Sequence, residues 1–263
     1  MAYVWNAEDY KENSKFQMKW GEELIGKLNL QSKDSVIDIG CGDGKISAMI
    51  SKIAVSGKTL GIDSSENMVK LASVSFPNEQ YQNLTFAKMD AAEIKLNEKF
   101  DAAFSNACLH WVKDHDMVLK GVRSCLKKNG KILFQMGGSG NAQDVTDSFS
   151  EVMKKNEWKN YFNGFMTPYC FYGMEHYEKW LPENDFKTVR IELIPKDMVY
   201  SNKDAFKGWL RTTWFPYTDP LPETLREDFL SDIVKTYKIN NNAGKLENIL
   251  VKMIRLEVEA YAK

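Results

Sequence analysis

A glycine-rich turn follows the first apolar segment of the chain. Gly40, Gly42 and Gly44 stand at alternate positions directly after residues 36–39, a β-branched run typical of a short buried parallel strand. Glycines let the backbone turn sharply and leave room for a ligand to lie against it. The spacing is G-x-G-x-G, whereas the dinucleotide fingerprint is G-x-G-x-x-G, so the third glycine comes one residue early.

Acidic residues stand in or directly after the predicted strands. Asp38 lies inside the first strand, and Asp63 ends the second, about twenty residues after the turn, where a ribose hydroxyl pair is often held. Asp90 ends a third strand. In a purely structural alternative, Asp63 is an N-cap, Asp90 starts a helix, and Met68 belongs to the core.

Short apolar runs alternate with helical periodicity through the first half of the chain. This alternation predicts βαβ units and therefore a parallel sheet in an α/β fold. Asn129 and Gly130 are expected to cap a helix and lead into the next strand. We expect strands over residues 35–39, 59–62, 84–90, 100–106 and 131–135, and helices near 14–30, 45–54, from Ser65 onward, and 113–127.

The pattern changes after residue 140, where two stretches rich in aromatic residues begin. We expect residues 1–140, with about 185–200 and 245–263, to form the sheet domain. Residues of about 141–184 and 201–244 would then form a helical cap over the carboxyl ends of the strands. Most of the aromatic side chains are expected to form the core of that cap, and a few to face a pocket.

Composition narrows the classes of protein that fit. The chain has 263 residues and a formal net charge of -1, which argues against a nucleic-acid partner. The cysteines are scattered without C-x-x-C pairs, which favours a reducing, cytoplasmic location. His110 and His115 are placed on different faces of a helix, so no metal site is expected. No apolar run has membrane-spanning length, and we expect no membrane partner and a monomer or homodimer.

The glycine turn, followed by acids at successive strand ends, resembles the cofactor site of class I S-adenosylmethionine (SAM) methyltransferases. The early third glycine and the acid inside the first strand favour SAM over NAD. The resemblance implies a Rossmann-like, doubly wound, seven-stranded and mostly parallel sheet with an antiparallel terminal strand. It implies that the cofactor is held by Asp38, Gly40, Cys41, Gly42, Asp63, Ser64, Met68, Asp90, Ala91 and Asn106. In such a site Asp90 could accept from the adenine amino group, and the backbone N–H of Ala91 could donate to a ring nitrogen.

Residues 107–115 narrow the resemblance to small-molecule carboxyl methyltransferases, the trans-aconitate and, more closely, the juvenile hormone acid methyltransferases. Residues 5–10 resemble the start of the trans-aconitate enzymes, whereas Gln17 resembles the juvenile hormone enzymes. The resemblance implies that Gln17 and Trp111 hold the carboxylate of the acceptor. Both side chains are neutral donors, which can orient a carboxylate without neutralising it. His110 is the candidate if a general base is needed.

We therefore expect a SAM-dependent O-methyltransferase that acts on the carboxylate of a small, partly apolar organic acid by in-line displacement. A carboxylate is already ionised at neutral pH, so no base is required. Alternatives are methylation of a hydroxyl, a nitrogen or a carbon of another small molecule, and a non-catalytic SAM-binding regulatory protein. The malonyl-carrier-protein methyltransferases share the cofactor motifs, but they would need a basic docking face that this sequence does not reveal.

Overall fold

The chain forms two compact units, which are described here separately. The computed structural model describes residues 15–241 and 248–263, with side chains from residue 18 onward. The first unit contains the chain up to residue 139, together with 169–194 and 255–263. The second unit contains residues 140–168 and 195–254. Residues 5–10, which entered the family resemblance, lie outside the described residues.

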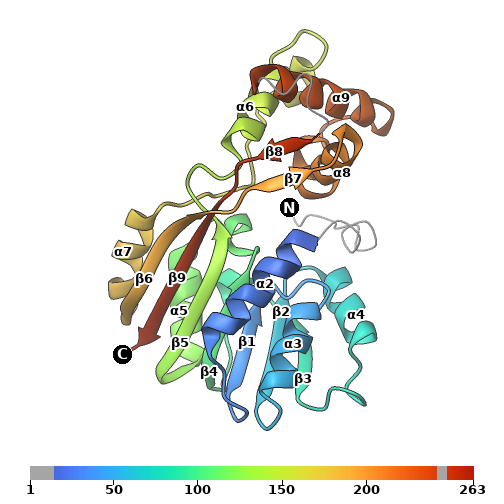
Figure 1. Ribbon diagram of the computed structural model, residues 1–263. Coiled ribbons are helices and arrows are strands. Elements are labelled where there is room, and N and C mark those ends of the chain that lie inside the picture. The colour runs from blue at the N-terminus through green and yellow to red at the C-terminus, as the bar shows by residue number, and fades with distance from the viewer. Residues whose placement is uncertain (1–14, 242–247) are drawn as a thin grey trace. The chain divides into compact units, whose positions relative to one another are not determined.

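The first unit carries the main sheet (Figure 1). Its elements are α2 (Lys15–Leu28), β1 (Ser35–Ile39), α3 (Lys45–Ile53), β2 (Lys58–Asp63), α4 (Glu66–Ser75), β3 (Leu84–Lys88), the 3-10 helix η1 (Ala91–Glu93), β4 (Phe100–Asn106), the 3-10 helix η2 (Leu109–Trp111), α5 (His115–Cys125), β5 (Leu126–Gly137), α7 (Met174–Glu183), β6 (Phe186–Pro195) and β9 (Ile254–Ala262).

The sheet has seven strands in the order β3-β2-β1-β4-β5-β9-β6. Strands β1 to β5 pair in parallel, whereas β9 runs antiparallel to β5. The predicted α/β, doubly wound fold with an antiparallel terminal strand is therefore confirmed. The chain passes from β1 to β2 on one side and later returns to place β4 on the other side. This reversal opens a crevice at the carboxyl ends of β1 and β4, where such sheets bind ligands.

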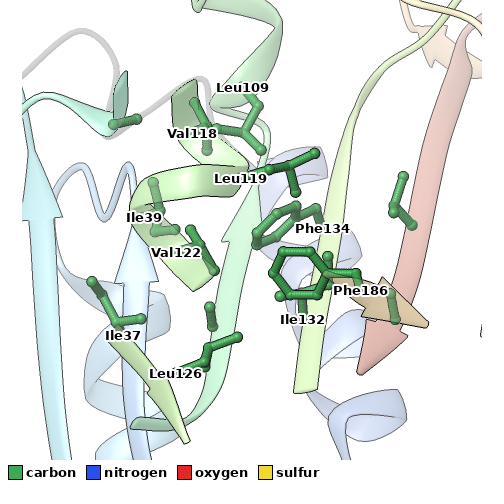
Figure 2. Close-up of a cluster of buried hydrophobic side chains, with 14 of the residues drawn as sticks. Ile37, Ile39, Leu109, Val118, Leu119, Val122, Leu126, Ile132, Phe134 and Phe186 are labelled. Carbon is green, nitrogen blue, oxygen red and sulfur yellow. The ribbon is translucent and has the colours of Figure 1, made fainter. Parts of the chain in front are cut away.

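Alternate strand residues point to opposite faces of the sheet, and helices cover both faces because both carry apolar side chains. Val36 packs with Leu24 of α2 and Ile50 of α3, whereas the next residue, Ile37, packs with the α5 side. Figure 2 shows Ile37 beside α5, whose Leu119 is fully buried. Helix α7 adds Tyr177 and Leu181 to the same cluster. Strands β1 and β4, at the centre of the sheet, are buried on both faces, which explains their short apolar runs.

The second unit has its own core. It consists of α6 (Gln143–Val152), the 3-10 helix η3 (Lys159–Phe162), β7 (Met198–Tyr200), α8 (Lys203–Thr213), the 3-10 helix η4 (Phe215–Tyr217), α9 (Glu223–Asn240) and β8 (Ile249–Val251). Strands β7 and β8 pair with each other in a separate antiparallel sheet. The Phe149 ring stacks on Tyr217 with a centroid distance of 4.3 Å, and Phe229 packs beside it. Many of the aromatic residues singled out in the sequence therefore form a core.

The predicted cap at Asn129 and Gly130 is wrong. Helix α5 ends at Cys125, and β5 begins at once with Leu126. Phe100 of β4 pairs with Leu126, but Ala102 pairs with Lys131, so residues 127–130 form a wide irregularity in the strand. Asn129 adopts a φ of 60°, a left-handed conformation that asparagine tolerates better than most residues. The turn signal was real, but it marks a bulge inside a strand.

The residue ranges of the two units differ from the expected domain ranges. Residues 169–184, expected in the cap, belong to the first unit, where α7 packs on the sheet core. Strands β7 and β8, expected in the sheet domain, lie in the second unit. Among residues 15–241 and 248–263, no helix is both long and apolar enough to cross a membrane.

Candidate functional site

The glycine turn joins the end of β1 to the start of α3. The backbone N–H groups of Gly40 and Cys41 both donate to the carbonyl of Ile62 in β2, at 2.8 and 2.9 Å. Gly44 adopts a φ of 81° and forms the N-cap of α3. The turn is therefore tied to the neighbouring strand before the helix begins, which holds its backbone in one conformation.

Two glycines of the turn serve different needs. A Cβ at Gly40 would collide with the side chain of Cys108, so this glycine allows close packing between two loops. Gly42 has a φ of 52°, and a Cβ there would meet no atom within 4 Å. The structure thus leaves an open space above the backbone at Gly42. A ligand can approach the chain closely at that point.

Asp63 connects the turn with the end of β2. Its carboxylate accepts a hydrogen bond from the N–H of Gly42 at 3.0 Å and another from the N–H of Ser65 at 2.8 Å. Burial raises the pKa of the Asp63 carboxyl, and the two N–H groups partly oppose that shift. A carboxylate offers roughly four lone-pair sites, so both oxygens keep capacity for the hydroxyls of a ribose.

Asp38 is the buried acid of β1, with 1% of its surface exposed. Its Oδ2 accepts a hydrogen bond from the Ser47 hydroxyl of α3 at 2.5 Å. Burial raises the pKa of Asp38 to about 7; the Ser47 bond lowers it and the charge of Asp63 raises it further. Asp38 therefore changes its charge near neutral pH, at the base of the cleft described next.

A cleft that is open to solvent lies at the carboxyl ends of β1 and β4. It is lined by Met18, Asp38, Gly40, Cys41, Gly42, Asp43, Lys45, Ile46, Asn106 and Ala107. Five of these were predicted from the sequence as cofactor residues: Asp38, Gly40, Cys41, Gly42 and Asn106. The helix residues Met18, Lys45 and Ile46 were not predicted, because no sequence pattern shows which face of α2 or α3 meets the turn. Ala107, in the turn after β4, adopts a left-handed φ of 55°.

The other predicted cofactor residues have these positions. Ser64 is exposed between β2 and α4, and Met68 is buried with 3% exposure. Asp90 is exposed and caps η1 by accepting from the N–H of Ala92 at 2.8 Å, while Ala91 is buried. The capping role agrees with the structural alternative for Asp90, and it leaves a contact to a ligand as a prediction.

Helix η2 carries both His110 and Trp111. The N–H of Gly137 donates to Nδ1 of His110 at 3.4 Å, which places the ring proton on Nε2. Burial, followed by the charge of Arg255, holds the pKa of His110 well below its usual range, so the ring is neutral. Its basic nitrogen is thereby engaged by the backbone. This geometry favours a structural role for His110 over that of a general base.

Residues 169–177 support η2 from one side. The N–H of Cys170 donates to the His110 carbonyl at 2.8 Å. His115 donates from Nε2 to the Leu109 carbonyl and accepts at Nδ1 from the Tyr177 hydroxyl, each at 2.8 Å. Burial lowers the pKa of His115 to about 4, which keeps the ring neutral and fixes these donor and acceptor roles.

Trp111 is half-buried and lies edge-on to Tyr169, with the ring centroids 4.5 Å apart. Tyr169 in turn stacks on Phe171. Gln17, its predicted partner, lies in α2, but its side chain is outside the described part of the structure. The structure therefore places Trp111 among aromatic rings and does not test the pairing. Within the described ranges, no group of His, Cys, Asp or Glu side chains is arranged to hold a metal ion.

The cleft fits S-adenosylmethionine. The open space at Gly42 would receive the methionine part, and Asp38 is placed to attract its ammonium group. Asp63, which accepts a hydrogen bond from the N–H of Gly42, would hold the ribose. The fit depends on the open space beside the backbone of Gly42, which a side chain at this position would fill.

Comparison with known proteins finds methyltransferases. The sequence model of a family described as a methyltransferase domain matches residues 30–192. An uncharacterized methyltransferase of Schizosaccharomyces pombe is 31% identical, and the match covers 79% of each chain. Juvenile hormone acid O-methyltransferase of Bombyx mori is 26% identical over 98% of this chain and 97% of its own. Trans-aconitate 2-methyltransferase of Agrobacterium fabrum is 26% identical over 99% of this chain and 100% of its own.

A solved structure supports the fold. Phosphoethanolamine N-methyltransferase 2 of Haemonchus contortus, in complex with S-adenosyl-L-methionine, matches with a TM-score of 0.59 and 19% identity. The match covers 97% of this chain and 56% of that chain. At this identity the likeness concerns the fold. The resemblance inferred from the sequence motifs is confirmed by the family match and by the named relatives.

We predict that Gly42→Val keeps the fold but abolishes SAM binding, because the branched side chain would fill the open space. Gly164 provides a matched control, since it also has a left-handed φ, of 73°, and no atom within 4 Å of a Cβ. Gly164→Val should carry a similar backbone strain, roughly 1–3 kcal/mol, and leave SAM affinity unchanged. Calorimetric titration of both variants checks this. Normal binding by folded Gly42→Val would contradict the assignment.

We predict that SAM affinity depends on the charge of Asp38. Above a pKa of about 7 the carboxylate is ionised and attracts the ammonium group, so affinity should fall as the pH falls from 8 to 6. The loss should reach up to about tenfold if only the ionised form attracts the cation. Dissociation constants measured across this range test it. An equal slope in Asp38→Asn would assign the titration to another group.

We predict that His115 destabilises the folded chain in acid. The folded state keeps the ring neutral down to a pKa of about 4, whereas the unfolded chain takes up the proton below about 6.5. Stability should therefore fall between pH 6.5 and 4, by about 3 kcal/mol relative to His115→Gln. Denaturant unfolding of both proteins at several pH values measures the difference. Parallel stability curves would show that His115 titrates normally.

Proposed function

The chain belongs to the methyltransferase-domain family and uses S-adenosylmethionine, and on that premise we propose that its acceptor is the carboxylate of a small, partly apolar organic acid. The reaction would be an O-methylation that yields a methyl ester. The similarity to juvenile hormone acid O-methyltransferase extends over nearly the whole of both chains, so it includes the residues outside the cofactor site.

The observation that carries the proposal is the state of His110. This histidine stands directly before Trp111, yet burial holds its pKa well below the usual range, which makes it a weak base, and its Nδ1 accepts from the backbone of Gly137. A hydroxyl or ammonium acceptor must lose a proton to become a nucleophile, whereas a carboxylate is already ionised at neutral pH. A histidine that is not free to take a proton therefore suits a carboxylate acceptor.

When bound, S-adenosylmethionine supplies a methyl group on a positively charged sulfur. The chain's own contribution is to hold the acceptor oxygen in line with that methyl group and to exclude water. Trp111 would donate its indole N–H to the acceptor carboxylate, and Gln17 its side-chain amide. Both donors are neutral, so they orient the carboxylate and leave its charge in place.

The apolar part of the acceptor would lie against aromatic rings. Tyr169 and Phe171 stack almost in parallel, with an interplanar angle of 5° and a centroid distance of 5.6 Å. Tyr169 also contacts Trp111, so these rings continue from the proposed carboxylate site. Flat aromatic surfaces of this kind bind hydrocarbon chains through burial of apolar area. That the second unit caps the acceptor stays a prediction.

We predict that Trp111→Phe lowers the turnover rate with saturating SAM by about tenfold and leaves SAM affinity unchanged. Phenylalanine keeps the contact with Tyr169 but removes the indole donor, and one lost hydrogen bond corresponds to roughly 1–1.5 kcal/mol. Radiolabelled methyl transfer to a panel of aliphatic carboxylic acids, with calorimetry for SAM, measures both quantities.

The same assay tests the type of acceptor. The product should be a methyl ester that alkali hydrolyses. The rate at saturating SAM should not rise between pH 6 and 8, as it would if a histidine had to lose its proton before acting as a base. A base-stable methylated amine, hydroxyl or carbon would rule out the carboxylate acceptor. SAM binding without transfer to any acceptor class would favour a regulatory protein.

A further inference from the structure

Among the described residues that line the cofactor cleft, Lys45 is the one basic side chain. It is the first residue of α3 and directly follows the glycine turn. The other charged side chains of the lining are two acids, Asp38 and Asp43. A cation in such a place either serves these acids alone or also serves a ligand that lies beside them.

Lys45 is paired with Asp43 at the edge of the turn. Its Nζ lies 2.7 Å from Oδ2 of Asp43, and its backbone N–H donates to Oδ1 of the same carboxylate at 3.3 Å. The side chain of Lys45 is 31% exposed, whereas that of Asp43 is 14% exposed. An ammonium has three N–H donors, and this pair occupies one of them. A ligand in the cleft can therefore bind to Lys45 while the pair with Asp43 stays intact.

The position of Lys45 in its helix also favours an anion beside it. The helix dipole places a partial positive charge at the N-terminus, where a lysine is unfavourable and an anion is favourable. Helix α3 has nine residues and no acid in its first turn. An anionic group at this end of the cleft would be attracted both by the ammonium of Lys45 and by the helix.

The cofactor brings one anionic group into this cleft. SAM carries an ammonium and a carboxylate on the same carbon of its methionine part. Asp38, which accepts from Ser47 of α3, is placed to attract the ammonium. The carboxylate then lies in the same cleft, close to the acids of the lining. A carboxylate near other carboxylates is repelled unless a cation compensates their charge, and Lys45 supplies that cation.

We propose that Lys45 binds the carboxylate of the methionine part of SAM and shields it from the charge of Asp43. The inference concerns the cofactor and is independent of which acceptor is methylated, so it does not rest on the proposed carboxylate acceptor. Lysine offers a compact charge with several donors, which suits a carboxylate in a cleft open to solvent.

The test compares two ligands that differ only in this carboxylate, S-adenosylhomocysteine and its decarboxylated analogue, S-adenosyl-3-thiopropylamine. In calorimetric titration, wild-type protein should bind S-adenosylhomocysteine about tenfold more tightly than the analogue, the effect of one charge-assisted hydrogen bond that is partly exposed to solvent. Lys45→Met should lose this difference and bind the analogue as the wild type does, whereas Lys45→Arg should keep most of it. Equal affinity of the wild type for the two ligands, or an undiminished difference in folded Lys45→Met, would overturn the inference.

Lys52→Met is the matched control. Lys52 stands in the last turn of the same helix, with its ammonium 5.6 Å from the ring centroid of Tyr81, and it does not line the cleft. This variant removes the same charge from the same helix, so both ligands should bind as they do to the wild type. A loss of affinity for S-adenosylhomocysteine equal to that of Lys45→Met would show that net charge attracts the ligand, and the contact at Lys45 would be disproved.

Asp43→Asn separates cofactor binding from a purely structural role of Lys45. It removes the charged partner and keeps the lysine, so S-adenosylhomocysteine should bind at least as tightly as to the wild type. If Lys45 only held the turn through Asp43, this variant would lose as much affinity as Lys45→Met, which would contradict the proposed contact. These titrations need no acceptor, so their outcome is independent of whether a carboxylic acid is methylated.

Discussion

The carboxylate of Asp63 holds together the two strand ends on which the site depends. It accepts from the glycine turn after β1 and from the residue that caps α4 after β2. One half-buried carboxylate thus fixes two loops that come from different strands. The same carboxylate is the group expected to bind the ribose, so binding the cofactor and shaping the cleft depend on a single side chain. A substitution at Asp63 would therefore change the conformation of the turn as well as remove a contact.

Local sequence patterns predicted the part of the fold that local interactions determine. The strands of residues 35–39 and 100–106 were predicted with the bounds that the structure has, because short apolar runs between turn signals mark buried strands. The bulge at Asn129 was missed, since a turn signal does not reveal whether a helix or a strand surrounds it.

The sequence did not reveal contacts between segments that lie far apart in the chain. The support of η2 by residues 169–177 depends on Tyr177 reaching His115 and on Cys170 reaching His110. Nothing in the spacing of these residues marks them as neighbours, and the aromatic composition of residues 141–184 concealed that the last part packs on the sheet.

The position of β9 has a consequence for how the molecule is assembled. This strand lies between β5 and β6, and Gln135 and Glu257, which meet across the β5–β9 pair, are separated by 122 positions along the chain. The residues of the second unit that lie between β6 and β9 must therefore be synthesised before the sheet can be completed. Closing so long a loop is slow, because its entropy is lost before the strand contacts form. Until then β5 and β6 lack their shared neighbour, and the nascent chain exposes two unpaired strand edges that a chaperone would recognise.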